Sequence, residues 1–406
     1  MSNSVIPYGK QSISQEDIDA VVEVLQSDYL TQGPKVKEFE EAFAKYVGAK
    51  YAVAVANGTA ALHLNSLALG VKEGDKVITS PITFAASANC IRYCGGEVVF
   101  ADIDPETYLL DIVKVRSLLE EDKDKNIKGI IPVDFAGRSV DLEAFRELAD
   151  EFNCWIIEDA CHAPGAFFKN NKREKVKAGS GVYADLAIFS FHPVKHIAAG
   201  EGGMITTNDE KLYTAISELR THGITRDTNK YKNAASLAVG DDLSDADDYP
   251  GWYMEMQALG YNYRLSDINC ALGLSQLKRA EAGLQRRREI AAVYRKAFKD
   301  IDQLTDRNYE AGQENNGHGY HLYVIEVEDR LGLYHFLREH NVFCQIHYVP
   351  THLMPYYQER GYKKGQYPAA EQYYGRCLSL PMFPTLTEEE QESVIRLIIE
   401  YYQTKS

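Results

Sequence analysis

Seven short apolar runs recur between residues 50 and 210, separated by segments with helical spacing. The runs are YAVAVA (51–56), KVITS (76–80), EVVFA (97–101), KGIIPV (128–133), CWIIEDA (154–160), DLAIFS (185–190) and GMITT (203–207). Between two of them, DLEAFRELADEF (141–152) has helical periodicity and begins with an acidic residue suited to a helix N-terminus. Apolar runs that alternate with helices are typical of a parallel sheet covered on both faces. We therefore expect an α/β fold with a mainly parallel sheet and helices on both faces.

The part of the chain after residue 260 has a different pattern, which predicts a long connector helix, two strands and a terminal helix. These elements are expected at 265–298, near 321–327 and 342–348, and at 387–403. A chain of 406 residues is long enough for one large domain that carries a smaller one. We predict a large domain over residues 1–260 and a small C-terminal α+β domain over residues 261–406.

Residues 227–252 form a polar, acidic segment rich in Asp, Asn and Gly. This composition favours turns over helices or strands. Loops of such length lie on the protein surface. We therefore predict a long surface loop here, with its acidic part at residues 227–248.

The chain contains 44 Lys and Arg residues against 59 Asp and Glu residues, which gives a net charge of -15. Because such a chain has no global positive field for nucleic-acid phosphates, we expect no nucleic-acid partner. Small phosphorylated ligands remain compatible with this charge, since the N–H groups at a helix N-terminus bind phosphate locally. A pocket for such ligands is expected to be locally electropositive.

The segment MSNSVIPYGKQS at residues 1–12 lacks the basic region and apolar core of a signal peptide. No apolar run approaches the roughly 20 residues that cross a bilayer. We therefore expect a cytoplasmic protein without a membrane partner. The seven cysteines contain no C-x-x-C pair, which argues against a disulfide framework or a structural zinc site.

The first motif with chemical content is NGTAAL at residues 57–62, which follows a predicted strand and opens a helix. A turn of small residues leaves N–H groups and the positive end of the helix dipole exposed, which suits a phosphate. The alternative is a plain capped helix start, and this motif alone does not separate the two.

The second motif is EDACH at residues 158–162, at the carboxyl end of the run CWII. Open α/β sheets bind ligands at this end of their strands. Asp159 could hold a protonated ring nitrogen, and His162 could donate a hydrogen bond to a neighbouring oxygen. The alternatives are helix capping by Asp159 and a hydrogen-bonded core histidine at position 162.

The third motif is SFHPVK at residues 190–195, followed by the glycine-rich turn GEGG at 200–203. A lysine between a buried strand and such a turn can lose its charge by desolvation and become a nucleophile toward an aldehyde. Lys195 could also be an ordinary solvated lysine. His192 and His196 are four residues apart, but no third ligand accompanies them, so we predict no metal site.

Together the three motifs resemble the sugar aminotransferases of the DegT/DnrJ/EryC1/StrS family, a branch of the fold-type I enzymes. The resemblance covers nearly the whole chain, through these segments in family order: SDYLTQGPKVKEFEEAFAKYVGAKYAVAVANGTAALHL, SPITFAASAN, EDACHAPGA, FSFHPVKHIAAGEGG, LRTHGITRD, GYNYRLSDINCALGLSQLKR and IHYVPTH. The resemblance implies an aspartate aminotransferase-like fold and the cofactor pyridoxal 5'-phosphate (PLP). Within the family, FSFHPVK, LRTHGI, PGWYMEMQALGYNYRLSDI and HYVPTH are most similar to the transaminases that act on a UDP-linked 4-keto sugar in pseudaminic acid biosynthesis.

The resemblance also implies roles for individual residues at the PLP site. Lys195 matches the catalytic lysine that binds the cofactor, Asp159 matches the carboxylate that pairs with the pyridine nitrogen, and His162 matches the partner of the phenolic oxygen. The phosphate cradle and the aromatic residue that stacks on the ring correspond to Thr59, Ala60, Ser190 and Phe84. Family members also receive a phosphate contact from a partner subunit, here Asn262 or, as second choice, Arg264. This contact implies a homodimer with shared active sites.

The implied reaction transfers an amino group from L-glutamate to C4 of a UDP-linked 4-keto-6-deoxy-N-acetylhexosamine. By resemblance, the nucleotide-sugar pocket is lined by Tyr29, Thr31, His222, Arg226, His347 and Tyr348. The acidic segment 227–248 departs from the compact pattern of the pseudaminic acid transaminases, which bears on the identity of the sugar and the nucleotide. The alternatives are amination of another nucleotide sugar, of the GDP-perosamine, UDP-bacillosamine or dTDP-amino sugar type, and a non-catalytic sugar-binding or regulatory homologue.

Overall fold

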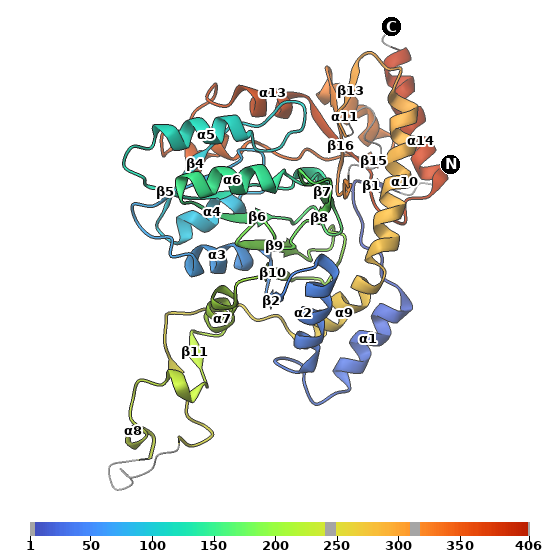
Figure 1. Ribbon diagram of the computed structural model, residues 1–406. Helices are drawn as coiled ribbons and strands as arrows, with labels where there is room; N and C mark the ends of the chain where they lie inside the picture. The colour runs from blue at the N-terminus through green and yellow to red at the C-terminus, as the bar shows by residue number, and fades with distance from the viewer. Residues whose placement is uncertain (1–4, 240–248, 309–316, 405–406) are drawn as a thin grey trace.

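A seven-stranded sheet lies at the centre of the computed structural model, which describes residues 5–239, 249–308 and 317–404 (Figure 1). Its strand order is β2-β10-β9-β6-β5-β3-β4. The strands are β2 (Tyr51–Val55), β3 (Lys76–Thr79), β4 (Glu97–Phe100), β5 (Ile127–Ile131), β6 (Trp155–Asp159), β9 (Leu186–Ser190) and β10 (Gly203–Thr207). Strand β10 is antiparallel to both of its neighbours, and the other pairs are parallel. The mainly parallel sheet expected from the seven apolar runs is confirmed.

Helices cover both faces of this sheet (Figure 1). They are α2 (Pro34–Val47), α3 (Gly58–Ala68), α4 (Ala86–Tyr93), α5 (Ile112–Glu121), α6 (Leu142–Phe152), α7 (Glu210–Leu219) and α9 (Asp267–Lys278). Neighbouring strand residues point to opposite faces, so Ile157 packs in one core with residues of α3, α4 and α7, while Ile156 packs in another with α5 and α6. Burial on both faces explains why these strands are apolar throughout. No helix in the described ranges is long and apolar enough to cross a membrane.

Helix α6 illustrates how the local sequence sets an element. Its apolar residues Leu142, Phe145 and Leu148 are buried at helical spacing. The carboxylate of Asp141 accepts a hydrogen bond from the Ala144 amide at 3.2 Å and so caps the N-terminus, as the sequence predicts. Asn153 ends the helix in the left-handed conformation with φ 56°.

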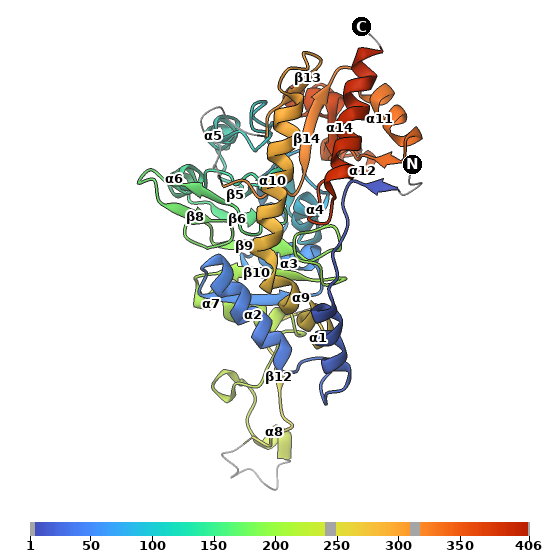
Figure 2. The ribbon, with the colours of Figure 1, turned by 90° about the vertical axis from the view of Figure 1, so that its right-hand side faces the viewer.

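The C-terminal part contains a three-stranded antiparallel sheet with helices packed against it (Figure 2). These elements are α10 (Ala280–Phe298), β13 (Leu304–Asp306), β14 (Tyr323–Val327), α11 (Arg330–Glu339), α13 (Pro368–Arg376), β16 (Cys377–Leu380) and α14 (Glu388–Gln403). The helix predicted at 265–298 is two helices, because Arg279 leaves the helical conformation with ψ 1° between α9 and α10. The expected strand near 321–327 and the terminal helix at 387–403 are present.

The strand predicted near 342–348 is confirmed only at β15 (Val342–Phe343). Strand β15 pairs with β1 (Ile6–Pro7), and beyond it Gln345 forms a single antiparallel bridge with Ser379 of β16 in the three-stranded sheet. The first described residues therefore contact an element of the predicted small domain. The predicted domain boundary between residues 260 and 261 stays a prediction.

An arm, defined here as residues 224–239 and 249–259, projects from the body of the molecule (Figure 1). Its base is the pairing of β11 (Ile224–Thr225) with β12 (Glu255–Met256), and α8 (Ser236–Val239) lies further out. The long surface loop predicted at 227–252 falls in this arm, although its residues 240–248 lie outside the described residues. Several large apolar side chains of the arm are exposed, namely Leu237, Trp252, Met254, Met256 and Leu259.

Candidate active site

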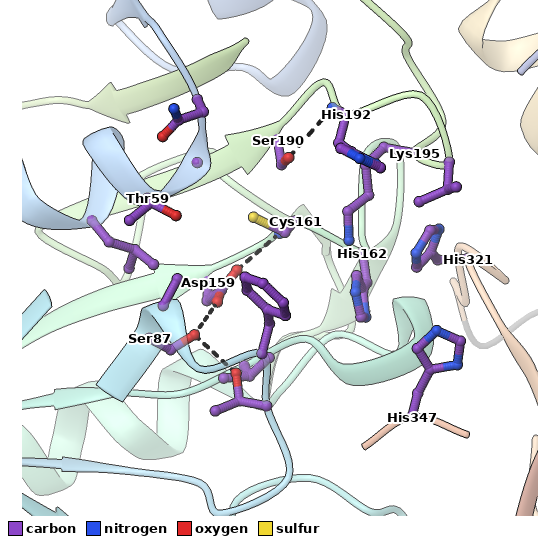
Figure 3. Close-up of a pocket in the computed structure, with 18 of the residues that line it drawn as sticks. Thr59, Ser87, Asp159, Cys161, His162, Ser190, His192, Lys195, His321 and His347 are labelled. Atoms are coloured by element: carbon purple, nitrogen blue, oxygen red, sulfur yellow. Dashed lines mark hydrogen bonds between the residues drawn. The ribbon is translucent and has the colours of Figure 1, made fainter. Parts of the chain in front are cut away.

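A cavity of about 440 Å³ opens at the carboxyl ends of β5, β6 and β9, in front of the N-terminus of α3 (Figure 3). Six of the residues that the sequence assigns to the cofactor meet here, since the cavity is lined by Thr59, Phe84, Asp159, His162, Ser190 and Lys195, whereas Ala60 is not among the lining residues. This is the end of an open α/β sheet at which ligands bind. The three sequence motifs therefore form one site.

The N-terminus of α3 forms one wall of the cavity. The side chain of Asn57 caps the helix and accepts a hydrogen bond from the Ala60 amide at 2.8 Å. The first N–H groups of a helix, here those of Gly58 and Thr59, have no acceptor within the helix. The capped start and the phosphate cradle, which the sequence leaves as alternatives, are thus compatible, but the Ala60 amide is already used by the cap.

Two glycines allow tight packing at this wall. A Cβ atom on Gly203 would lie 2.6 Å from the carbonyl carbon of Asn57, and one on Gly58 would lie 3.2 Å from Cβ of Ser190. Strand β10 and the end of β9 can therefore approach the start of α3 closely. This approach places Ser190 beside the helix N-terminus.

Asp159 lies at the end of β6 and is 5% exposed. Its Oδ2 accepts a hydrogen bond from Ser87 Oγ at 2.6 Å, and its Oδ1 accepts one from the Cys161 amide at 3.2 Å (Figure 3). Thr83 Oγ1 lies 2.8 Å from Ser87 Oγ and extends this network. A turn follows Asp159, so the helix-capping alternative is wrong. The carboxylate is fixed at the cavity wall.

His162 is buried beside Asp159, and both of its ring nitrogens have partners. The Ala136 amide donates to Nδ1 at 3.3 Å, and Nε2 lies 3.2 Å from the Tyr348 hydroxyl. Because Nδ1 accepts a hydrogen bond, the neutral ring carries its proton on Nε2. Burial, assisted by the positive charge of Lys195, holds the pKa of His162 well below its ordinary value. His162 is therefore a neutral donor.

Lys195 follows β9 and directs its side chain into the cavity (Figure 3). Burial lowers the pKa of its amine, while Cys161 and Asp159 act in the opposite direction. A lowered pKa increases the fraction of neutral, nucleophilic amine. The alternative of a solvated surface lysine is wrong.

Behind Asp159, Asp134 and Glu158 form a buried pair of carboxyl groups. Asp134 accepts a hydrogen bond from the Val140 amide at 2.9 Å, and Glu158 accepts one from the Gly179 amide at 2.9 Å. Burial raises the pKa of both groups, and the negative charge of Asp159 adds to this effect. Two adjacent buried carboxyl groups resist joint ionisation, so the pair keeps a proton to higher pH than solvated carboxyl groups do.

The predicted nucleotide-sugar and partner-subunit residues divide into two groups. His347 and Tyr348 line the cavity. The others lie outside the cavity of their own chain and are Tyr29, Thr31, His222, Arg226, Asn262 and Arg264. Asn262 pairs with Thr221 in an isolated antiparallel bridge, and Arg264 pairs with Val55 in another. Because Val55 ends β2 just before α3 begins at Gly58, Arg264 lies near the start of α3.

The described side chains of one chain do not by themselves make the cavity wall electropositive, so the expected electropositive pocket, which depends on helix ends and a partner subunit, stays a prediction. Lys195 is the single Lys or Arg side chain among those that line the cavity, against the carboxylates of Asp159 and Glu201. The predicted cations Arg226 and Arg264 lie elsewhere. Among the described residues, no group of three or more His, Cys, Asp or Glu side chains is placed to hold a metal ion.

Sequence reasoning missed Tyr8, Ser87 and His321, which also line the cavity. Ser87 lies in the segment SPITFAASAN, whose small polar residues after a buried strand are a usable signal. His321 directly precedes the apolar run of β14, a position with no comparable signal. These residues come from segments far apart in the chain.

A model of the DegT/DnrJ/EryC1/StrS aminotransferase family matches residues 11–399. The chain is 38% identical over 406 residues to the spore coat polysaccharide biosynthesis protein SpsC of Bacillus subtilis, covering 98% of this chain and 97% of that protein. It is 37% identical over 383 residues to a UDP-4-amino-4,6-dideoxy-N-acetyl-beta-L-altrosamine transaminase of Campylobacter jejuni, covering 93% and 92%.

The structure of PseC from Helicobacter pylori, an aminotransferase involved in pseudoaminic acid biosynthesis, has a TM-score of 0.85 at 29% identity. The likeness covers 99% of this chain and 100% of that chain. Aminotransferases of this family depend on PLP. The resemblance derived from the three motifs is thus confirmed. The chain belongs to the DegT/DnrJ/EryC1/StrS aminotransferase family and is a PLP-dependent sugar aminotransferase.

Proposed function

We propose that the protein moves an amino group from L-glutamate to C4 of a UDP-linked 4-keto-6-deoxy-N-acetylhexosamine, in a pathway of the pseudaminic acid type. The observation that carries the chemistry is the convergence of Lys195, Asp159 and the N-terminus of α3 on one cavity. The choice of sugar is supported by the altrosamine transaminase and by PseC, which are similar over nearly the whole chain. Other nucleotide 4-keto sugars are the second candidates.

The cavity residues fit PLP. The N–H groups at the start of α3, with Thr59 and Ser190, suit the phosphate, because this end of a helix favours anions. Asp159 suits the pyridine nitrogen, and Nε2–H of His162 suits the phenolic oxygen. Phe84 is 64% exposed at the cavity, which leaves one face of its ring available for stacking.

Bound PLP supplies an electron sink for a carbanion at the substrate carbon. Asp159 keeps the ring nitrogen protonated, because a buried carboxylate favours the charged pyridinium. Lys195 would hold the cofactor through Nζ. When freed by the amino donor, Nζ would serve as the base that moves the proton from the α-carbon of the donor.

The proposed active form is a homodimer with shared active sites. Asn262 is exposed and lies outside the cavity of its own chain, as a residue that serves a partner must. Arg264 is the second choice for this contact. The exposed apolar residues of the arm supply a surface that a second subunit can cover.

The test is incubation of the PLP-loaded protein and glutamate with a panel of UDP-, GDP- and dTDP-linked 4-keto sugars. Mass spectrometry and NMR then identify the aminated product. We expect conversion of the UDP-linked 4-keto-6-deoxy-N-acetylhexosamine. Preferred turnover of another nucleotide sugar would select the second candidates, and the absence of 2-oxoglutarate from the PLP form would indicate a non-catalytic homologue.

Borohydride reduction tests the role of Lys195. We expect peptide mass spectrometry to find the reduced cofactor on Lys195 of the wild type, and the visible absorbance of the bound cofactor to be lost in Lys195→Ala. A cofactor mass on another residue would contradict this assignment.

A further inference from the structure

One end of the cavity is not used by the proposed cofactor contacts. It is formed by Tyr8, His321 and His347 around His162. The ring of His321 lies 4.2 Å from that of His162, and the ring of Tyr8 lies 5.2 Å from that of His347. Figure 3 shows His321 beside His162 and Lys195, with His347 on the same side of the site. This end lies next to the reactive amine.

His321 has an unsatisfied polar atom. Its side chain is 4% exposed, and its Nδ1 is buried without a hydrogen-bond partner among the described residues. Leaving a buried ring nitrogen unpaired costs free energy, which a ligand at this position can recover. In His347, Nδ1 lies 2.9 Å from the Ser379 hydroxyl, so Nε2 is the ring nitrogen available to a ligand.

These imidazoles are neutral. Burial lowers the pKa of His321 well below its ordinary value, and the neighbouring His162, Lys195, His196 and Arg287 add to this effect. Burial lowers the pKa of His347 to about 3, and the charge of Lys195 adds to it. Lys195, the single Lys or Arg side chain among the described residues of the cavity wall, is assigned to the cofactor. A carboxylate at this end would therefore meet neutral N–H donors that can take up a proton, since an adjacent anion raises the pKa of histidine.

We propose that His321, together with His347, binds a carboxylate of the amino donor and takes up a proton when the donor binds. This inference rests on the proposed function. The α-carboxylate of an amino acid is attached to the carbon whose proton Lys195 transfers, so it must lie close to Nζ. The diphosphate of a nucleotide sugar is separated from the reacting C4 by the hexose ring, and therefore fits this end less well.

Proton uptake has a direct consequence for donor affinity. The empty site does not hold the proton at neutral pH, whereas the occupied site does. Donor affinity is therefore expected to fall as the pH rises from the low pKa of the empty histidine towards its higher pKa in the complex, and to level off above that second pKa. After the donor has become a keto acid and leaves, the histidine returns the proton to solvent.

The first experiment measures binding without turnover. Glutarate, a dicarboxylate without an amine, is titrated into the PLP holoenzyme by calorimetry in buffers of different ionisation heat. We expect uptake of up to about one proton per glutarate in the wild type. His321→Gln keeps a neutral donor but does not take up the proton, so it should lose this uptake and bind glutarate about ten-fold more weakly. The exposed His335 provides the control His335→Gln, which should match the wild type.

UDP is titrated in parallel, because it carries a diphosphate and no carboxylate. The inference would be overturned if UDP binding, and not glutarate binding, were coupled to proton uptake that depends on His321. That result would assign these histidines to the nucleotide. Uptake with glutarate that persists in His321→Gln would also overturn it. His321→Asn serves as the second variant if the glutamine variant does not fold.

The second experiment compares the two half-reactions through the absorbance of the cofactor. In His321→Gln we expect KM for glutamate to rise about ten-fold and to lose most of its pH dependence, with kcat little changed. The reverse half-reaction from the 4-amino sugar involves no amino-acid carboxylate and should stay within about two-fold. A purely structural role predicts equal loss in both half-reactions and would overturn the inference. A wild type that does not react with glutamate would contradict the proposed function instead.

Discussion

Single residues in this site act through neighbours that come from other parts of the chain. Asp159 and Lys195 are recognisable from the motifs around them. Ser87 has a weaker signal in the segment SPITFAASAN, and His321 has no comparable signal. The reason is physical: Ser87 approaches Asp159 from a position 72 residues away, and His321 approaches from beyond the connector helix. A local sequence pattern identifies the catalytic residue, whereas the neighbours that position its side chain are found only from the fold.

The hydrogen bond from Ser87 to Asp159 predicts that Ser87→Ala weakens cofactor binding. The variant removes a donor to a buried carboxylate, which costs about 1.5 kcal/mol or more, equivalent to about ten-fold in the PLP dissociation constant. Absorbance titration of the apoenzyme with PLP measures this constant. Ser117→Ala, on the exposed face of α5, is the matched control and should bind PLP as the wild type does. Unchanged affinity in Ser87→Ala would show that this bond does not support the cofactor.

The shared proton of Asp134 and Glu158 predicts a pH-dependent stability. Because the pKa of the pair is raised, the folded protein binds more protons than the unfolded chain at pH values above the ordinary pKa of carboxyl groups. The free energy of unfolding therefore falls as the pH rises from that range through the raised pKa. Glu158→Gln substitutes an amide donor for the shared proton, so its stability should fall less steeply.

Urea unfolding between about pH 5 and about pH 9 measures this difference in slope. The exposed Glu147 provides the control Glu147→Gln, which should follow the wild type. Parallel curves for Glu158→Gln and the wild type would mean that the pair holds no proton.

At the scale of elements, the sequence analysis succeeds where a pattern is local. All seven strands of the main sheet are visible as apolar runs because burial on both faces makes them apolar throughout. It fails where pairing is distant. Strand β15 is only two residues long and pairs with β1 from the start of the chain, and the break at Arg279 between α9 and α10 has no Gly or Pro to mark it.

The contact between β10 and the start of α3 predicts that Gly203→Ala disturbs both the fold and the cofactor site. The added Cβ atom would lie 2.6 Å from the Asn57 backbone, so β10 or α3 must move. We expect a loss of about 2 kcal/mol in the free energy of unfolding, and weaker PLP binding. Urea unfolding and PLP titration measure the two effects.

Gly375 provides the control for this substitution. It lies in α13, and a Cβ atom added there would meet no neighbouring atom within 4 Å. Gly375→Ala should therefore leave PLP binding unchanged and should not destabilise the helix, since alanine favours the helical conformation more than glycine does. If the Gly203→Ala variant is destabilised but binds PLP with wild-type affinity, the packing of β10 does not contribute to the phosphate site.

At the scale of the whole molecule, some of the predicted site residues lie outside the cavity of their own chain and are proposed to serve the cavity of a partner subunit. The described cavity wall of one chain carries Lys195 as its single Lys or Arg side chain, while Arg264 and Asn262 lie outside it, near the arm. A chain of net charge -15 that binds phosphorylated ligands needs local donors at its site. In the proposed homodimer, each subunit completes the other's site, so the functional unit is larger than the chain.

This arrangement predicts complementation between two defective variants. Lys195→Ala removes the amine of its own site, whereas Asn262→Ala removes a phosphate contact from the partner's site. In a mixed dimer both lesions fall in one site, and the other site is intact. Random exchange of equal amounts makes about half of the dimers mixed, so about a quarter of wild-type activity should return.

The measurement is turnover at limiting PLP, before and after the two variants are mixed under conditions that exchange subunits. Arg264→Ala in place of Asn262→Ala tests the second choice for the shared contact. Lys195→Ala mixed with Asp159→Ala is the control, because both residues serve the same chain. Its mixed dimers have one lesion in each site and should recover no activity. Recovery in neither the Asn262 nor the Arg264 mixture would contradict a phosphate contact shared between subunits through these residues.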